Sequence, residues 1–248
     1  MRPEERCYNC GDVIIKKEIT REHIPAKNLF EGYDVKYKVQ RITVSSCLKC
    51  NHQYSPTDED FRNMIGTIAK RKENNEIANK AQRSLLRKDP ARESFTLDSL
   101  GKVSGIRLNQ ITVEDYHKKN FKGLFLHQYG KVFDDKKYAV YVNIDESDWS
   151  LPTLGILGYL KDLFVRKVSG HEDILNYSIQ PFHLGITNSE KNDLVPNENE
   201  NIYVGYFDYV KEHAALVIVV RKKYLCKIKW KKRSQRITEF MTKLLICR

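Results

Sequence analysis

The sequence has no apolar run as long as a membrane-spanning helix, and its first residues are charged, whereas a secretory signal has an apolar core. We therefore expect neither membrane insertion nor export, and we expect the protein in the cytoplasm. The chain also lacks a glycine-rich phosphate loop and any internal repeat, which argues against P-loop enzymes and solenoid proteins.

The chain carries 43 Lys and Arg against 32 Asp and Glu, a formal net charge of +11. With 41% hydrophobic and 30% charged residues, this is the composition of a soluble globular protein. The basic excess favours a polyanionic partner, most simply nucleic acid, although composition alone does not separate this from an anionic membrane surface. A chain of 248 residues has room for one large domain or two small ones.

Four of the six cysteines form two CxxC pairs, Cys7 with Cys10 and Cys47 with Cys50. Two such pairs are the usual ligand set of a closed structural zinc site, because each tight turn aims both sulfurs at one ion. Two disulfides or four unrelated buried cysteines are the alternatives. In the reducing cytosol a metal is the commoner cross-link. Cys226 and Cys247 follow no pairing pattern, and we interpret them as ordinary thiols.

Between and after the cysteine pairs, the pattern predicts two strands and a helix. Residues 12–20 and 39–46 are rich in β-branched side chains, which predicts two strands separated by a loop over 26–38. Pro25 should end the first strand, because proline has no amide proton. Apolar residues at helical spacing predict one helix from Ser55 to about Lys88, with Ser55 as N-cap and Asp58 closing a capping box.

The motifs in this region appear in a distinctive order: CxxC at Cys7, Glu22-His23-Ile24-Pro25, CxxC-Asn at Cys47–Asn51, and Ser55-x-x-Asp-Glu-x-Phe. The order resembles the HNH endonucleases, or ββα-metal nucleases, in their zinc-knuckle form. The resemblance covers about the first third of the chain. It implies an α+β protein in which an HNH ββα-metal module with a four-cysteine zinc site (residues 1–90) precedes a mixed α+β domain (residues 91–248).

The resemblance also implies a role for each matching residue. His23 would be the general base that takes a proton from the attacking water. Glu22 and Asn51 would hold the catalytic ion, and oxygen ligands of this kind suit Mg²⁺ or Mn²⁺. The family's middle motif residue, usually Asn, orients the catalytic histidine. Gln40 stands at that position here and carries the same amide one methylene further out, so it either orients His23 with altered geometry or leaves the site weaker.

The residues alone leave other interpretations open. Asn51 could cap the knuckle turn, and His52 beside it is an alternative ligand. Asp58 and Glu59 are interpreted as helix-start charges favoured by the helix dipole. Adjacent residues of a strand point to opposite faces, so Glu22 and His23 can flank one phosphate only where the strand end twists.

The second part of the chain has weaker signals. Strands are predicted at 103–108, 110–113, 138–144, 202–210 and 214–220, and an extended stretch at 177–186. Helices are predicted to start within 112–121 and to cover 149–168 and 237–245, with a polar surface loop over 188–201.

A basic stretch follows, with nine Lys and Arg and no acid between Arg221 and Arg236. It is either a solvated edge strand or a track for a phosphate backbone. The candidate nucleic-acid contacts are Lys227, Lys229, Lys231, Lys232 and Arg233.

Together these features predict a metal-dependent endonuclease that hydrolyses phosphodiester bonds in DNA, with RNA left open as a substrate. The C-terminal half would bind substrate, recognise a protein partner or control activation. The family resemblance implies a setting in restriction or phage defence. The rival hypothesis is a zinc-stapled protein that binds nucleic acid or protein and has no chemistry.

Overall fold

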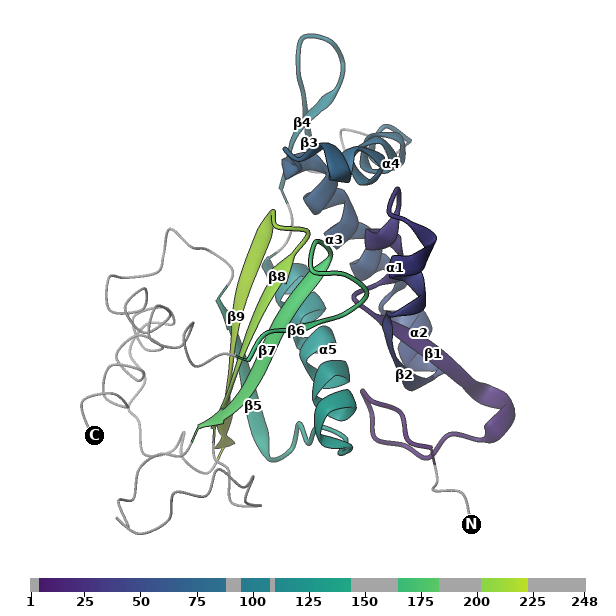
Figure 1. Ribbon diagram of the computed structural model, residues 1–248, viewed down its shortest axis with the longest axis vertical. Helices are drawn as coiled ribbons and strands as arrows, with labels where there is room; N and C mark the ends of the chain where they lie inside the picture. Colours follow the sequence, from purple (N-terminus) through teal and green to yellow (C-terminus); the bar gives the residue numbers. More distant parts are fainter. Residues whose placement is uncertain (1–4, 88–94, 108–109, 144–164, 183–201, 223–248) are drawn as a thin grey trace, which may run out of the picture. The chain divides into compact units, whose positions relative to one another are not determined.

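The computed structural model describes residues 5–87, 95–107, 110–143, 165–182 and 202–222 (Figure 1). Helices and sheets both contribute, which confirms the mixed α+β class. The chain forms two compact units. The first contains the residues up to Phe133 with Lys167–Tyr177 and Phe207–Ala214, and the second contains the rest. Among the described helices, none has the length and apolar character needed to cross a membrane.

An antiparallel hairpin opens the first unit. β1 (Ile19–Ile24) pairs with β2 (Ile42–Cys47), so that Glu22 lies opposite Val44. Both strands begin later than predicted. The short 3-10 helix η1 (Lys16–Glu18) precedes β1. Helix α1 (Val35–Val39) lies within the predicted loop and includes Val39, the first residue of the predicted second strand. β1 does end just before Pro25, as predicted.

Short helices follow each strand. A 3-10 helix, η2 (Lys27–Phe30), follows β1, and α2 (Leu48–Gln53) follows β2. The single helix predicted from Ser55 to Lys88 is wrong. The structure has α3 (Ser55–Ile68), η3 (Lys72–Asn74) and α4 (Asn75–Leu85) in its place.

A carboxylate from a residue far along the sequence holds the interruption between α3 and α4. Glu212 accepts hydrogen bonds from the backbone N–H groups of Lys70 and Arg71, at 2.8 and 2.9 Å. These contacts satisfy amides that a continuous helix would have bonded internally. The two helices then pack closely at Gly66, where an added Cβ would lie 2.5 Å from the Cβ of Ala81.

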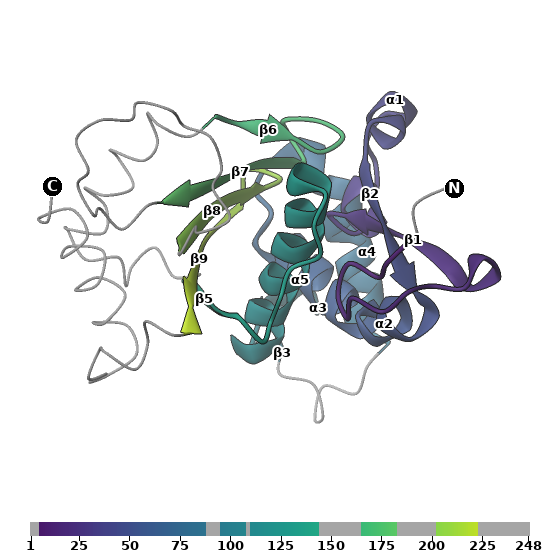
Figure 2. The ribbon, with the colours of Figure 1, turned by 90° about the horizontal axis from the view of Figure 1, so that it is seen from below.

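Helix α5 (Gln110–Tyr129) packs against the hairpin (Figure 2). Its start replaces the strand predicted at 110–113, and the helix predicted within 112–121 is confirmed and continues to Tyr129. Gly123 permits the close approach, since a Cβ there would lie 1.7 Å from Cδ1 of Ile24. Half of the residues of α5 are buried, and the buried polar ones are Glu114, His117, Lys119 and Asn120.

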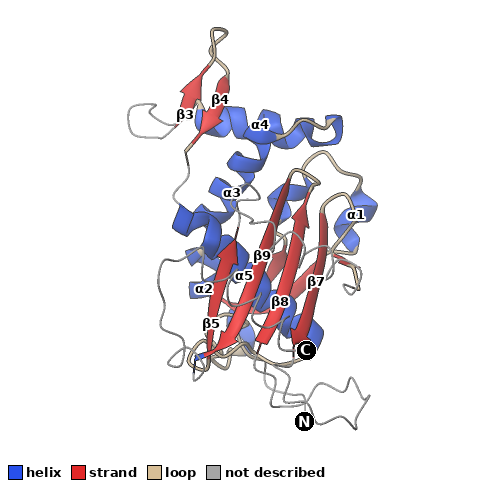
Figure 3. Ribbon diagram, turned by 90° about the vertical axis from the view of Figure 1, so that its left-hand side faces the viewer, coloured by secondary structure: helices blue, strands red, loops and turns tan. Residues whose placement is uncertain are grey.

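A second pair of strands, β3 (Phe95–Leu97) and β4 (Val103–Ile106), lies beside α4 (Figure 3). The Gln82 side chain on α4 exchanges two hydrogen bonds of 2.8 Å with the backbone of Val103. These bonds fix β4 to the helix.

The remaining strands form one sheet in the order β5-β9-β8-β7-β6. They are β5 (Tyr138–Asn143), β6 (Lys167–Val168), β7 (Leu175–Phe182), β8 (Ile202–Tyr209) and β9 (His213–Arg221). Strands predicted at 138–144, 202–210 and 214–220 are confirmed. The predicted helix over 149–168 is wrong at its end, where β6 forms, and its other residues up to 164 lie outside the described ranges. The loop over 188–201 and the helix over 237–245 lie outside them too.

Candidate active site and cysteine cluster

The structure brings the four predicted metal ligands together. The sulfurs of Cys7, Cys10, Cys47 and Cys50 all lie within 4.8 Å of one another. Sulfurs of a tetrahedral site with metal–sulfur bonds of about 2.3 Å are separated by about 3.8 Å. The four cysteines are therefore close enough to hold a metal ion, and none of the four forms a disulfide.

Two turns deliver these sulfurs. The first follows Cys7, whose carbonyl accepts a hydrogen bond from Gly11 N. The second is the start of α2, where the Cys47 sulfur accepts from the backbone N–H of Cys50. Burial raises the pKa of the Cys50 thiol to about 11. Four thiolates packed this closely would repel one another, and a divalent cation would offset that repulsion.

Beside this cluster, two acids and a lysine meet in the interior of the first unit. The Lys119 ammonium lies 2.9 Å from Oε1 of Glu22 and 2.5 Å from Oδ1 of Asp58, and its side chain is 0% exposed. Burial raises the pKa of both carboxyls, and the nearby Lys119 charge opposes that rise. The pair of acids is thus held by a cation from α5.

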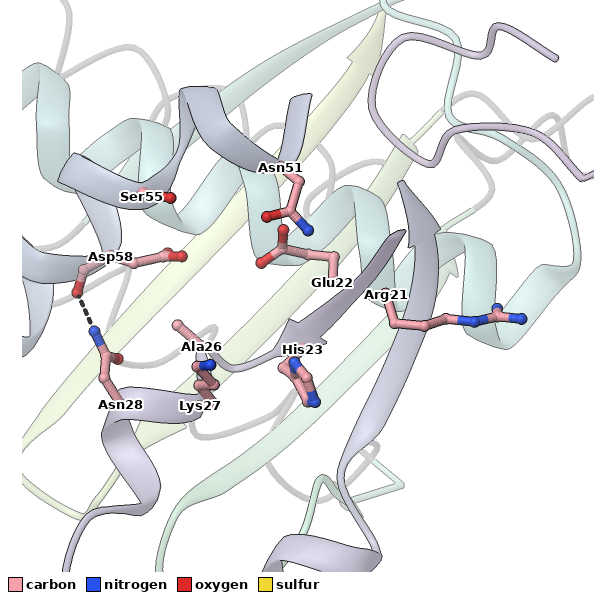
Figure 4. Close-up of a pocket in the computed structure, with 9 residues that line it drawn as sticks. All are labelled: Arg21, Glu22, His23, Ala26, Lys27, Asn28, Asn51, Ser55 and Asp58. Atoms are coloured by element: carbon pink, nitrogen blue, oxygen red, sulfur yellow. Dashed lines mark hydrogen bonds between the residues drawn. The ribbon is translucent and has the colours of Figure 1, made fainter. Parts of the chain in front are cut away.

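A cavity of about 400 Å³ opens next to Glu22 and Asp58, the two acids bound to Lys119 (Figure 4). Its lining comes from β1, from η2 with the residue before it, from α2 and from the start of α3. The lining residues are Arg21, Glu22, His23, Ala26, Lys27, Asn28, Asn51, Ser55 and Asp58. Three of the four predicted catalytic residues are among them.

Asn51 faces Glu22 across the cavity. Its amide nitrogen donates a 3.1 Å hydrogen bond to Oγ1 of Thr20, which in turn donates to the carbonyl of Ser46. Because the nitrogen is engaged in this way, the carbonyl oxygen is the atom that Asn51 presents toward Glu22. The hydrogen bond of Asn51 thus goes to β1, and the side chain that caps α2 is that of Cys47.

His23 lies at the same cavity as Glu22, although the two side chains leave β1 in different directions (Figure 4). Burial lowers the pKa of His23, and the positive charges of Arg41, Lys27 and Lys119 lower it further. Its imidazole is therefore neutral at neutral pH and can accept a proton.

Gln40 lies away from this group. It is the C-cap residue of α1, its side chain is exposed, and it is absent from the residues that line the cavity. Its backbone carbonyl accepts a hydrogen bond from Gly170 N at 3.1 Å. The reason is that β2 begins only at Ile42, so the position predicted on the returning strand precedes that strand. The structure does not bring Gln40 to His23.

Two residues of the site are missed by sequence reasoning. Asp58 is expected to be a helix-start charge, but its carboxylate pairs with Lys119 rather than capping α3, whose N-cap residue is Tyr54. One feature of the sequence could have identified Lys119. It lies three residues after Tyr116, at a position on the apolar side of the helix. A lysine at such a position is rarely fully buried unless it is paired.

The alternative ligand His52 is exposed on α2 and does not line the cavity. Glu59 pairs with Arg62 at 3.7 Å and accepts a hydrogen bond from Ser84, outside the cavity lining. The candidate nucleic-acid contacts Lys227 to Arg233 lie outside the described residues.

No family model matches the chain, and neither does any curated protein or solved structure. The residues and the geometry of the cavity are therefore the basis on which a function is inferred.

Proposed function

We propose that this protein is a metal-dependent endonuclease of the HNH type, which hydrolyses phosphodiester bonds in DNA. The single observation that carries the proposal is that His23, Glu22 and Asn51 line one cavity beside four clustered cysteines. A structural zinc ion is proposed for the cysteines, because four sulfurs within 4.8 Å suit a closed tetrahedral site.

The cavity offers donors that fit a second ion. Glu22 and Asn51 present oxygen atoms toward it, and Oδ1 of Asn28 in the same lining is buried with no hydrogen-bond partner among the described residues. Hard oxygen donors suit Mg²⁺ or Mn²⁺ rather than zinc. When bound, such an ion would stabilise the negative charge that grows on the phosphate oxygens.

The protein side chains would accept the proton and attract the anionic substrate. Neutral His23 would accept the proton of the water that attacks phosphorus, which requires an unprotonated imidazole at the working pH, and the lowered pKa of His23 favours that form. Two of the cations whose charge reaches His23, Arg41 and Lys27, also favour the approach of an anionic backbone, and Lys27 lines the cavity itself. Restriction or phage defence is the setting that the family resemblance implies.

Plasmid cleavage tests the proposal. Zinc-loaded wild-type protein, His23→Ala and His52→Ala are incubated with supercoiled DNA in Mn²⁺, in Mg²⁺ and in excess chelator. We expect nicking by the wild type and by His52→Ala, whose residue is exposed outside the cavity. We expect His23→Ala to be slower by about 10²–10⁴-fold.

The second candidate is a zinc-stapled binding protein without chemistry. The exposed position of Gln40 favours it, because His23 then lacks the orienting amide expected from the family. It predicts equal DNA affinity of wild type and His23→Ala, and no metal-dependent nicking by either.

A further inference from the structure

Lys119 is the least expected residue of the site. Its side chain is 0% exposed, and a buried ammonium is costly unless it is fully paired. Its two carboxylate partners come from different elements, Glu22 from β1 and Asp58 from α3. Lys119 therefore joins three elements at the edge of the cavity.

The position of the ammonium is fixed from several sides. Two of its three N–H groups have carboxylate partners. The rings of Tyr54 and Tyr116 lie 5.6 and 5.8 Å from Nζ, within the range of cation–π attraction. An ammonium confined in this way holds its partners in one geometry.

The confined ammonium fixes the orientation of the Glu22 carboxylate. Oε1 of Glu22 is bound to Lys119, which leaves Oε2 as the oxygen not engaged by that ammonium. Asn51 is arranged in the same manner, since its amide nitrogen is tied to Thr20. Each of the two proposed ligands thus has one atom anchored by the protein, which is how outer contacts orient ligands at metal sites.

We propose that Lys119 is a positioning residue of the divalent-cation site, which orients the Glu22 carboxylate through a buried hydrogen bond. This inference rests on the proposed function, because it takes Glu22 as a ligand of the catalytic ion. The competing explanation is that Lys119 only balances the charge of two buried acids.

The two explanations predict opposite changes in the affinity for a divalent cation when the lysine charge is removed from a protein in which residue 58 is neutral. In an Asp58→Asn background, removing the lysine charge makes the site more negative by one unit. Charge alone then predicts tighter binding of a divalent cation. Positioning predicts weaker binding, because Glu22 loses the donor that orients it.

The experiment measures Mn²⁺ binding by electron paramagnetic resonance in zinc-loaded protein. Three variants are compared: Asp58→Asn, Asp58→Asn/Lys119→Met and Asp58→Asn/Lys119→Gln. We expect the Met variant to bind Mn²⁺ about 10–100-fold more weakly than the Asp58→Asn parent. The Gln variant has the same charge as the Met variant but keeps a donor, and we expect it to bind within about threefold of the parent.

Equal binding by the Met and Gln variants, or tighter binding by the Met variant than by the parent, would overturn the proposal. If the Met variant does not fold by circular dichroism, the Gln variant decides alone. Affinity within threefold of the parent supports positioning, and an affinity more than tenfold tighter supports charge balance.

A wild-type control separates this result from the proposed function. Wild-type protein should bind Mn²⁺, and Glu22→Gln should abolish that binding. If wild type shows neither Mn²⁺ binding nor nicking, the nuclease proposal fails. If wild type binds and nicks but the Lys119 variants follow charge alone, only the positioning role fails.

Discussion

Two buried residues of α5, Lys119 and His117, lie two positions apart and have opposite surroundings. Lys119 meets two carboxylates beside a cavity. His117 meets a second imidazole, with Nε2 3.1 Å from Nε2 of His213, and the ring of Phe61 stands edge-on to it at 5.4 Å.

The difference shows what distinguishes a candidate site from a core. Burial lowers the pKa of both histidines, so both are neutral, and the aromatic rings of Phe61, Tyr116 and Tyr209 surround them. On the lysine side, charges of both signs are retained at the edge of a cavity. Burial of an ionisable group alone does not identify a functional site; partner charges at an accessible cavity give a stronger indication.

Loss of the proposed zinc ion should produce the largest difference in local stability between the Lys119 side and the His117 side of α5. The amide of Asn9 donates to the Cys50 sulfur, and the Tyr54 hydroxyl, whose ring faces Lys119, donates to Asn9. We expect Cys50→Ser to lose zinc, with a loss of apparent stability on the order of 10 kcal/mol in this region. Hydrogen exchange should rise sharply over β1 and α2 and much less around His117.

The exposed residue Lys49, inside the same CxxC, provides the matched control. Lys49→Ala should keep its zinc and its protection. Unchanged exchange over β1 in the zinc-free Cys50→Ser protein would show that the cysteine cluster does not support the site.

Substitutions on the two sides of α5 should differ in their effect on stability. Lys119→Met leaves two buried carboxylates without a cation, which should destabilise the protein by about 3–5 kcal/mol. His117→Phe removes one neutral hydrogen bond within an aromatic cluster and should cost about 1 kcal/mol. Urea unfolding measures both values, and comparable losses would contradict the contrast drawn here.

The two sides should also respond oppositely to acid. Burial lowers the pKa of His213 to about 4, and that of His117 also falls below its usual value. Between about pH 6.5 and 4 the unfolded chain therefore binds protons that the folded chain does not, and stability falls as the pH falls. His213 alone contributes on the order of 3 kcal/mol across that window. The raised pKa values of Glu22 and Asp58 act in the other direction, because protonation relieves their burial.

Urea unfolding between pH 4 and 7 measures this dependence. A double variant, His117→Phe/His213→Phe, should have a flatter profile than the wild type, whereas His52→Ala should match the wild type because His52 is exposed. A double-variant profile as steep as that of the wild type would rule out the histidine pair as the cause.

The smallest change in the free energy of unfolding is expected for a substitution of a surface lysine. Lys80 pairs with Glu31 at 2.6 Å, a distance similar to that of the Lys119 contacts, but both side chains are about 40% exposed. Solvent screens such a pair, so Lys80→Ala should change the free energy of unfolding by less than about 1 kcal/mol. A loss as large as that of Lys119→Met would mean that burial is not what makes the Lys119 contacts matter.

Local motifs predict one half of the site well. The two CxxC pairs and the Glu22-His23 pair lie in a short stretch, so their spacing is enough to predict that the cysteines cluster, and the structure also places Glu22 and His23 at one cavity. The α+β class follows from alternating strand and helix patterns.

Contacts distant in the sequence are not predictable in the same way. Glu212 holds the interruption after α3, and no local signal at Ile68 reveals a carboxylate that lies far along the chain. Gly123 lets α5 approach Ile24 closely, and Lys119 of the same helix reaches Glu22, two residues before Ile24. Gln40 lies off the returning strand because α1, capped by Asp34, extends through Val39, where that strand is expected to begin.

Anomalous X-ray scattering from crystals of zinc-loaded protein soaked in Mn²⁺ tests the central claim most directly. We expect a zinc peak among the four cysteine sulfurs and a separate manganese peak within bonding distance of Glu22 and Asn51. A single peak at the sulfurs, with no manganese in the cavity at saturating Mn²⁺, would contradict it.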